Sequence, residues 1–238
     1  FGVKPFYFYQ REGVFVFASE IKSLLQFPGV KAEVDQKSLY EYLTFQMVLN
    51  RHTLFQNIQK LNPASYLIIK DGKVVEKKRY WDVNFTIDTE TKEEDYADEL
   101  LSLIEDSISI QTRSDVPLGA HLSGGLDSSI VSTLACKYQD GEFKTFTGGF
   151  KEDKIYDETN YARLVSDAIG SKHYEIFPTS TDFAGLFEKL VYHMDEPAAG
   201  PGLFPQYMVS KLASEEVKVV LGGQGGDEVF GGYARYAV

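Results

Sequence analysis

The chain has 238 residues, of which 43% are hydrophobic and 25% are charged, a composition typical of a globular protein with one large or two small domains. Its formal net charge of -11 argues against nonspecific binding to nucleic acid, which requires Lys and Arg to neutralise phosphates. The sequence contains neither an apolar run long enough to span a bilayer nor a signal peptide, so we expect no membrane association. The single cysteine, Cys136, predicts a packed thiol and a cytoplasmic location.

The first third of the chain has the pattern of an antiparallel sheet. FYFYQREGVFVFA contains two aromatic-rich runs separated by a polar turn. YLIIKDGKVVEKKRYW contains two more runs around Asp71 and Gly72, a dipeptide suited to a tight hairpin turn. Residues 19–25 and 38–48 are predicted to form short helices. The second of these carries an apolar face made of Leu39, Leu43 and Met47.

A different pattern follows the polar segment NFTIDTETKEEDY, which is predicted to be a linker that includes the start of a helix. Strand-like and helix-like segments then alternate in the order PLGAHL, DSSIVSTLACKY, KTFTGGF, YARLVSDAI, HYEIF, FAGLFEKLVYHM with LFPQYMVSKLA, and VKVVL. Repetition of strand and helix predicts a doubly wound parallel α/β sheet. Ligands of such sheets bind at the carboxyl ends of the strands.

The segment SGGLDSS lies at this edge, directly after a predicted strand. Gly124 and Gly125 allow a sharp turn that leaves backbone N–H groups open, and the next helix directs its N-terminus to the same place. With the hydroxyls of Ser123 and Ser128, these N–H groups could hold a pyrophosphate, at about 1.5–3 kcal/mol for each hydrogen bond to the anion. Asp127 among phosphates requires a divalent cation, and Mg²⁺ is the simplest choice. The alternative is that these residues only turn the chain and cap a helix.

Other phosphate and nucleophile motifs fit poorly. SGGLDSS has neither the spacing nor the lysine of a Walker loop. The dinucleotide fingerprint begins at Gly223 but meets Glu228 where its third glycine should stand. Ser123 does not lie in the G-x-S-x-G motif of a hydrolase nucleophile.

Several segments carry a specific resemblance. SGGLDSS after PLGAHL resembles the pyrophosphate-binding loop of N-type ATP pyrophosphatases, and LGGQGGDEVFGGYARY resembles the second signature of the glutamine-dependent asparagine synthetase family. HMDEPAAGPG and YDETNYARLV are similar to the same family. FGVKPFYFY, FASEIKSLL and TLFQNIQKLNPASYLI resemble the latter half of its N-terminal glutaminase domain. The resemblance therefore covers nearly the whole chain.

The resemblance implies a division into two domains. Residues 1–84 would be the C-terminal part of a class II glutaminase domain, with the antiparallel sheet of an Ntn-type α+β fold. Residues 85–95 would be a linker. Residues 96–238 would be the N-terminal part of an ATP pyrophosphatase synthetase domain, a doubly wound α/β fold of the adenine nucleotide alpha hydrolase-like type.

The resemblance also implies an activity, that of an amide-forming ligase using ATP and Mg²⁺. The side-chain carboxylate of aspartate, or a related carboxylate, attacks the α-phosphate of ATP, and ammonia derived from glutamine then displaces AMP. Small molecules would thus be the substrates, and a homodimer is a further expectation.

The site residues follow from the same resemblance. ATP would be bound by Leu122, Ser123, Gly124, Gly125, Asp127, Ser128, Gly148, Gly222 and Gly223. Asp127 and Asp227 would hold the metal, and the catalytic set would be Asp127, Asp227, Gln224 and Glu228. Asp195 and Glu196, in the DEP segment, would serve either structure or catalysis.

Two positions depart from the family pattern. Gln224 stands where the family often has a glutamate thought to act as base during amide formation, and a neutral amide cannot take up a proton. Gly148 replaces a bulkier apolar residue, which would loosen or reshape the adenine pocket. Together they favour a divergent branch, in which a carboxylate other than free aspartate is a candidate substrate.

The ends of the chain predict a partial sequence. The family's glutaminase nucleophile is an N-terminal cysteine, whereas residue 1 is Phe1, and the segment that supplies a catalytic lysine would follow residue 238. We therefore expect these residues to be inactive alone. Two alternatives remain: a divergent or β-lactam synthetase-like enzyme that adenylates another carboxylate, and a non-catalytic nucleotide-binding module.

Overall fold

The computed structural model describes residues 2–151, 157–197, 200 and 202–237, which fall into two compact units. Unit 1 comprises Phe1–Ile87 and Phe187–Gly200, and unit 2 comprises Asp88–Leu186 and Pro201–Val238. Parts of YDETNYARLV and HMDEPAAGPG lie outside the described residues. The chain thus leaves unit 2 after Leu186, contributes one segment to unit 1 and then returns.

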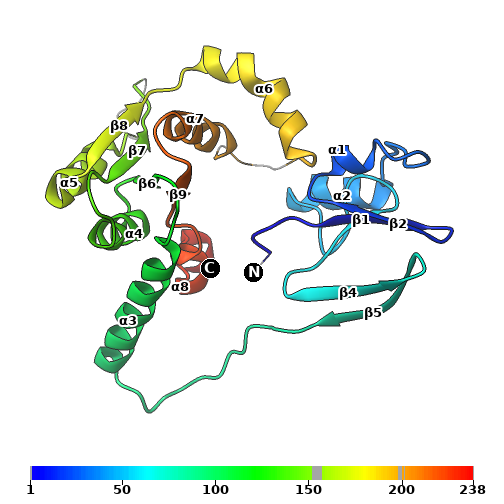
Figure 1. Cartoon of the computed structure of the whole chain (residues 1–238), viewed down its shortest axis with the longest axis horizontal. Helices are drawn as coiled ribbons and strands as arrows, with labels where there is room; N and C mark the ends of the chain where they lie inside the picture. The colour runs from blue at the N-terminus through cyan, green and yellow to red at the C-terminus, as the bar shows by residue number, and fades with distance from the viewer. Residues whose placement is uncertain (1, 152–156, 198–199, 201, 238) are drawn as a thin grey trace. The chain divides into compact units, whose positions relative to one another are not determined.

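Unit 1 contains the four predicted antiparallel strands and one further strand, at residues 58–60, that was not predicted. Its strands are β1 (Tyr7–Arg11), β2 (Val14–Ala18), β3 (Ile58–Lys60), β4 (Ser65–Lys70) and β5 (Lys73–Arg79). The first three form a sheet in the order β2-β1-β3, and β4 pairs with β5 (Figure 1). Asp71 and Gly72 adopt positive φ angles of 49° and 70°, as a tight two-residue hairpin turn requires. Both predicted hairpins are confirmed.

The two helices of unit 1 are shorter than predicted. α1 (Ile21–Leu24) packs into a core made of Tyr9, Ile21, Leu24, Val30 and Ile58. α2 (Gln36–Phe45) starts at Asp35, whose carboxylate accepts the backbone N–H of Ser38 at 2.8 Å. The apolar face predicted for this helix is only partly formed. Met47 lies beyond the helix end and Leu43 is 69% exposed, because periodicity does not report which face is covered.

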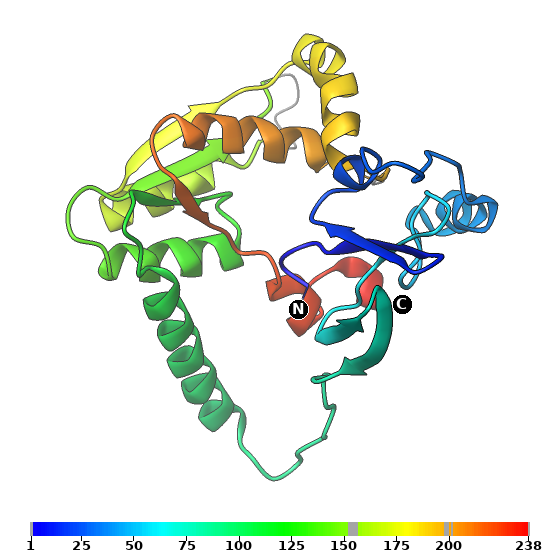
Figure 2. The same cartoon turned by 45° about the vertical axis from the view of Figure 1, so that its right-hand side comes forward.

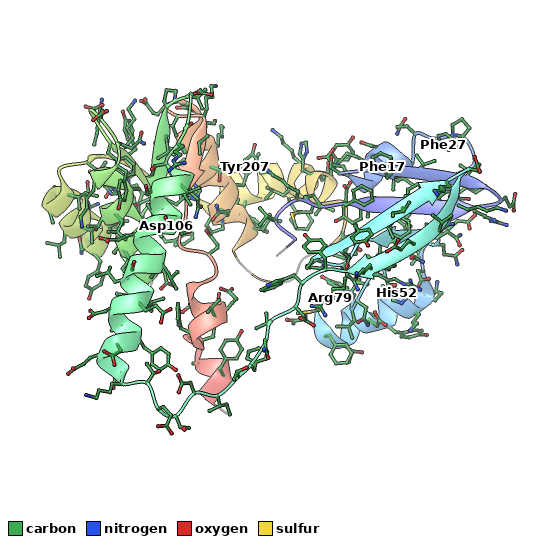
Figure 3. All side chains as sticks on the ribbon, turned by 60° about the horizontal axis from the view of Figure 1, so that its bottom comes forward. Phe17, Phe27, His52, Arg79, Asp106 and Tyr207 are labelled. Atoms are coloured by element: carbon green, nitrogen blue, oxygen red, sulfur yellow. The ribbon has the colours of Figure 1, made fainter. Side chains whose placement is uncertain are left out.

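The hairpin of β4 and β5 leads into the linker. Figure 3 shows Arg79 where β5 ends, and its guanidinium pairs with Asp82 at 2.6 Å. Irregular chain then runs to α3 (Glu93–Gln111), which starts with three acidic residues at the positive end of the helix dipole. Ile108, near the other end of α3, is buried in the core of unit 2.

Unit 2 is built on the predicted parallel sheet. Its strands are β6 (Leu118–His121), β7 (Lys144–Gly148), β8 (Lys172–Ile176) and β9 (Val219–Leu221). They run parallel in the order β8-β7-β6-β9. β7 and β8 therefore extend the sheet on one side of β6 and β9 extends it on the other. The loops after β6 and β9 consequently leave the same edge at the point where the strand order reverses, which is where open α/β sheets bind ligands.

Helices cover both faces of this sheet, which confirms the doubly wound class (Figures 1 and 2). α3 and α4 (Leu126–Lys137) pack against a core formed by Ile108, Leu118, Ala120, Leu134, Ala135 and Phe143. α5 (Thr159–Ile169) contacts β7 and β8. α7 (Leu203–Ser214) packs on the opposite face, where its residues form a core with Phe146 and Val217.

The remaining helices of the described chain are α6 (Ser180–Met194), α8 (Gly226–Phe230) and a 3-10 turn at Ala234–Ala237. Cys136 of α4 is a free thiol whose Sγ lies 3.5 Å from the carbonyl oxygen of Ile169, and burial raises its pKa. Across the described residues, every helix falls short of the length and apolarity needed to cross a bilayer.

A glycine in β6 tests how tightly the sheet is packed. A Cβ atom on Gly119 would lie 2.6 Å from the carbonyl oxygen of Lys144 and 2.9 Å from the ring of Phe146. We expect Gly119→Ala to lower the free energy of unfolding by about 1–3 kcal/mol, because the buried sheet cannot yield without strain. Gly185→Ala, in a part of α6 with open space around it, should stabilise by about 0.5–1 kcal/mol. Urea unfolding of both variants measures the difference, and equal midpoints would contradict the packing.

Candidate active site

The first glycine-rich loop starts from a firmly held strand end. The Leu122 N–H donates to the carbonyl oxygen of Phe146 at 2.9 Å, and the Thr147 hydroxyl donates to the Leu122 carbonyl. Leu122 itself is fully buried. The loop therefore leaves β6 in a fixed direction. Thr147 was not among the predicted residues, although a threonine in a buried strand is a signal that a hydroxyl satisfies a backbone group there.

Two serine hydroxyls close this loop on itself. The Ser123 Oγ and Ser128 Oγ atoms lie 2.9 Å apart, and the Ser123 N–H donates to Ser128 Oγ at 3.2 Å. The Gly125 N–H donates to Ser123 Oγ at 3.3 Å. Ser128 is buried, whereas Ser123 is exposed. The geometry therefore makes Ser128 an internal support of the loop and leaves Ser123 accessible to a ligand.

The two glycines of the loop differ in their surroundings. Gly124 has a φ of +86°, and a Cβ there would lie 2.6 Å from both the Ala162 N atom and the Tyr161 Cβ of α5. Only glycine fits both the backbone conformation and this close approach. Gly125 occupies the N-cap position of α4 and is exposed. The loop is thus packed against α5 on one side and open at the N-terminus of α4 on the other, which is a suitable place for an anion.

The second glycine-rich segment, after β9, packs directly against the first. A Cβ on Gly223 would lie 2.7 Å from the Ser128 N atom and 2.8 Å from the Asp127 Cβ. A Cβ on Gly226 would collide with the Asp127 carboxylate. The pairing of β6 with β9, for example Ala120 with Leu221, brings the two segments together. Gly226, which the sequence analysis did not single out, is therefore required by the position of Asp127.

The polar residues of the second segment have specific local partners. Glu228 Oε2 accepts the Gly225 N–H at 3.0 Å and Glu228 Oε1 accepts the Tyr233 hydroxyl at 2.8 Å, so its carboxylate holds the start of α8. Gln224 is exposed, and its side chain folds back over Gly222, so a Cβ atom on Gly222 would collide with Gln224 Oε1. Asp227 is half-buried, with its carboxylate against Gly232.

Gly148 marks the exposed end of β7 and lies under α7. A Cβ on this residue would come within 2.7 Å of Val209 Cγ2. Val209 is 8% exposed and belongs to the same core as Phe146. The absent side chain of Gly148 is therefore replaced by Val209, and a bulkier residue would require α7 to move.

A histidine borders the site. The His121 ring lies at the end of β6, with its Nδ1 atom 3.1 Å from Gln206 Nε2 on α7, and burial lowers the pKa of the imidazole. The histidine thus packs between sheet and helix. Figure 3 shows Tyr207, the next residue along α7.

The acidic residues suit a metal held jointly with a ligand. No cluster of three or more His, Cys, Asp or Glu side chains able to hold a metal occurs among the residues that the structure describes. Mg²⁺ in nucleotide sites is usually bound through one or two carboxylates together with substrate phosphates. The Asp127 carboxylate lies against Gly226, and Asp227 is the next residue in the chain, with its carboxylate against Gly232. Asp195 and Glu196 belong to unit 1 and are bound there by its backbone and lysines.

Comparison with known proteins identifies the family of the chain. Residues 99–238 match asparagine synthase and residues 1–81 match the glutamine amidotransferase domain. The chain belongs to the asparagine synthase family, with part of an amidotransferase domain preceding the synthase region.

Individual relatives agree with the family. Glutamine-hydrolyzing asparagine synthetase 1 from Bacillus subtilis (strain 168) is 35% identical over 99% of this chain, and the amidase chyE from Penicillium rubens is 28% identical over 99%. The chain spans 37% of the length of each. Among solved structures, an NH3-dependent NAD synthetase from Campylobacter jejuni is similar to this chain with a TM-score of 0.39 and 15% sequence identity. The similar region covers 58% of this chain and 60% of the synthetase chain, and a similarity this low supports no functional conclusion.

A substitution at Gly223 tests the contact between the two glycine-rich segments. We expect Gly223→Ala to lower pyrophosphate exchange into ATP about 100-fold in the full-length protein, since a shift of about 1 Å in a site is enough for such a loss. Gly202→Ala, at a position with open space around it, serves as the control. Exchange rates within twofold of each other in the two variants would show that the segments need not touch.

Proposed function

We propose that the protein containing this chain is a glutamine-hydrolysing asparagine synthetase. Its reaction is adenylation of the side-chain carboxylate of aspartate by ATP, followed by amidation of the acyl-adenylate with ammonia derived from glutamine. The observation that carries the proposal is the packing of Gly223 and Gly226 against Ser128 and Asp127, which joins both family signatures in one site. The match to asparagine synthase over residues 99–238 supports the same reaction.

The first step requires a grip on the leaving pyrophosphate. An attacking carboxylate breaks the bond between the α-phosphorus and its bridging oxygen, and negative charge accumulates on the β,γ-phosphates that leave. Backbone N–H groups of the loop and of the first turn of α4, with the Ser123 hydroxyl, would bind these oxygens. Ser128 would hold the loop in shape, because its hydroxyl is already hydrogen-bonded to Ser123. Leu122, Gly124, Gly125 and Gly222 would form the backbone around the nucleotide.

Different residues would bind the metal and the adenine. Asp127 and Asp227 would hold Mg²⁺, which when bound neutralises phosphate charge in the adenylation step. Gly148, exposed at the end of β7, would lie beside the adenine, with Val209 filling the space above it. Glu228 would act by holding Gly225 and Tyr233 in place rather than by touching substrate.

The second step is where Gln224 matters. Amide formation releases a proton from the attacking ammonia, and a neutral carboxamide cannot accept it. Gln224 would orient the adenylate by hydrogen bonds, and the proton would pass to another acceptor. A second candidate function follows from this residue and from Gly148: the same chemistry on a different carboxylate. The similarity to a protein named as an amidase is compatible with such variation.

The supply of ammonia is assigned to the amidotransferase part. Residues 1–81 match the glutamine amidotransferase domain, so we assign glutamine as the nitrogen donor of the full-length protein. The packed thiol of Cys136 fits a reducing compartment, and we place the reaction in the cytoplasm.

Pyrophosphate exchange tests the adenylation step. We expect the full-length protein with Mg²⁺ and L-aspartate to exchange pyrophosphate into ATP, and Asp127→Asn to lower the rate at least 100-fold, because the metal loses a ligand. Asp115→Asn, an exposed aspartate before β6, controls for the change of charge.

A panel of carboxylic acids separates the candidate functions. Exchange stimulated only by another acid would keep the mechanism and replace aspartate as the substrate. ATP binding without exchange, whichever acid is supplied, would contradict the enzyme and favour a nucleotide-binding module.

Substitution of Gln224 tests the amidation step. We expect Gln224→Glu to raise the rate of amide formation with ammonia about 10-fold, because a carboxylate adds a general base at this position. Gln111→Glu, exposed at the end of α3, is the control. Product analysis by mass spectrometry measures the rate of amide formation, and a rate unchanged from that of the parent would show that no base is needed at residue 224.

A further inference from the structure

One segment of the chain belongs by sequence to the synthase and by structure to the amidotransferase part. Phe187–Gly200, here called the anchor segment, lies inside the asparagine synthase match at residues 99–238. The structure nevertheless groups it with unit 1, which contains the amidotransferase match at residues 1–81. Within it, the described residues Asp195 and Glu196 make contacts that tie it to unit 1.

Asp195 caps a helix that lies 174 positions earlier in the chain. The residue at the N-cap of α1, Glu20, makes no side-chain hydrogen bond to the helix within the described structure. The Asp195 carboxylate instead accepts the Ile21 N–H at 2.7 Å and the Lys22 N–H at 3.2 Å. Asp195 has a φ of 59°, in the left-handed region, where it follows the end of α6. This backbone conformation is tolerated by aspartate and turns the chain after α6.

Lys22 adds a charge to the same contact. Its Nζ lies 2.9 Å from Asp195 Oδ1, and the side chains are 17% and 7% exposed. The ammonium also lies 5.4 Å from the centre of the Tyr192 ring, which the anchor segment supplies. Burial lowers the pKa of Lys22, but the hydrogen bonds and charges of Asp195 and Glu20 together outweigh it, and the net shift of the pKa is upward. An ion pair this well shielded from water is sensitive to loss of either partner.

Glu196 binds a second part of unit 1. Its Oε1 accepts the Leu54 N–H at 3.1 Å, and Oε2 lies 3.9 Å from Lys60 Nζ. Burial raises the pKa of the Glu196 carboxyl. The neighbouring Tyr7 has a raised pKa because of its own burial and the charges of Glu196 and Asp195.

The groups held by these carboxylates form the centre of unit 1. Ile21 and Leu24 of α1 are 0% and 1% exposed in its core, and Ile58, which precedes Lys60 on β3, is 2% exposed. Movement of the anchor segment would therefore release both α1 and the chain leading into β3.

The helix that follows the anchor segment in the sequence packs against a strand of the proposed nucleotide site. α7 begins at Leu203, shortly after Gly200, and packs Val209 and Ala213 against Phe146 of β7. Val209 also approaches Gly148, at the exposed end of the same strand. A shift of β7 on nucleotide binding would move α7, and α7 follows the anchor segment directly in the sequence.

We propose that Asp195 and Glu196 are positioning residues through which the state of the nucleotide site controls glutamine hydrolysis in the amidotransferase part. This inference rests on the proposed function for both half-reactions. Its specific claim is that Asp195 and Glu196, which lie between α6 and α7 in the synthase part of the sequence, control the activity of the glutaminase part.

The test uses full-length Asp195→Asn and Glu196→Gln, which keep the size of each side chain and remove its charge. Two quantities are measured: glutamine hydrolysed per AMP formed, and AMP formed when ammonia replaces glutamine. We expect the glutamine ratio to rise at least threefold in each variant, with ammonia-dependent AMP formation within twofold of the parent. The stimulation of glutamine hydrolysis by ATP and aspartate should fall as well, because hydrolysis that is uncoupled from the nucleotide site no longer responds to the ligands of that site.

Glu188→Gln is the matched control, because it removes an exposed carboxylate from the same segment. If Asp195→Asn yields little folded protein, Lys60→Gln tests the Glu196 contact instead, by removing the cation 3.9 Å from its carboxylate together with the 3.4 Å hydrogen bond of Lys60 Nζ to the Val48 carbonyl. Ratios equal to that of the control, or an equal loss of glutamine-dependent and ammonia-dependent AMP formation in folded protein, would overturn the proposal. A parent protein that forms no AMP with ammonia would instead contradict the proposed function.

Discussion

The close approach of two backbone segments is the constraint on which the candidate site depends. Gly223 and Gly226 lie so near Ser128 and Asp127 that no side chain fits between them. Because β6 and β9 are neighbouring parallel strands, their loops leave the sheet at the same edge and must share limited space. Glycine in both loops lets an acidic side chain and open N–H groups face one place. The sheet order, the glycines and the acidic residues are therefore parts of one solution to anion binding.

The surroundings of this junction are held by hydrogen bonds that leave certain groups open. Ser128 and Thr147 use their hydroxyls to fix the loop and the strand before it, whereas Ser123 and Gly125 stay exposed. Glu228 holds the turn that follows β9. This division between supporting and accessible groups is what a site needs in order to bind phosphate oxygens without rearranging. It also explains why a chain with a net charge of -11 can be proposed to bind ATP: the donors are local and mostly backbone.

The proposed coupling gives the anchor segment a role beyond stability. A helix without a cap of its own, as far as the described residues show, depends on Asp195 from a distant part of the chain. Such long-range capping joins the folding of α1 to the path of the chain between α6 and α7. A protein that must match ammonia release to adenylate formation benefits from this kind of linkage, because each half-reaction is wasteful without the other.

The sequence by itself determined most element types, the hairpins and the doubly wound class, because periodicity, turn residues and strand-helix alternation are local signals. It did not predict β3 or α8, whose runs are too short for such signals. The glycine-rich motifs and their resemblance also indicated the family. Only the tertiary structure decided that Gly226 must be glycine, that Val209 fills the space at Gly148, and that Asp195 and Glu196 belong to unit 1. The exposed Leu43 and Met47 show the same limit. Each of these facts depends on which distant atoms approach one another, and a one-dimensional pattern carries no record of such contacts.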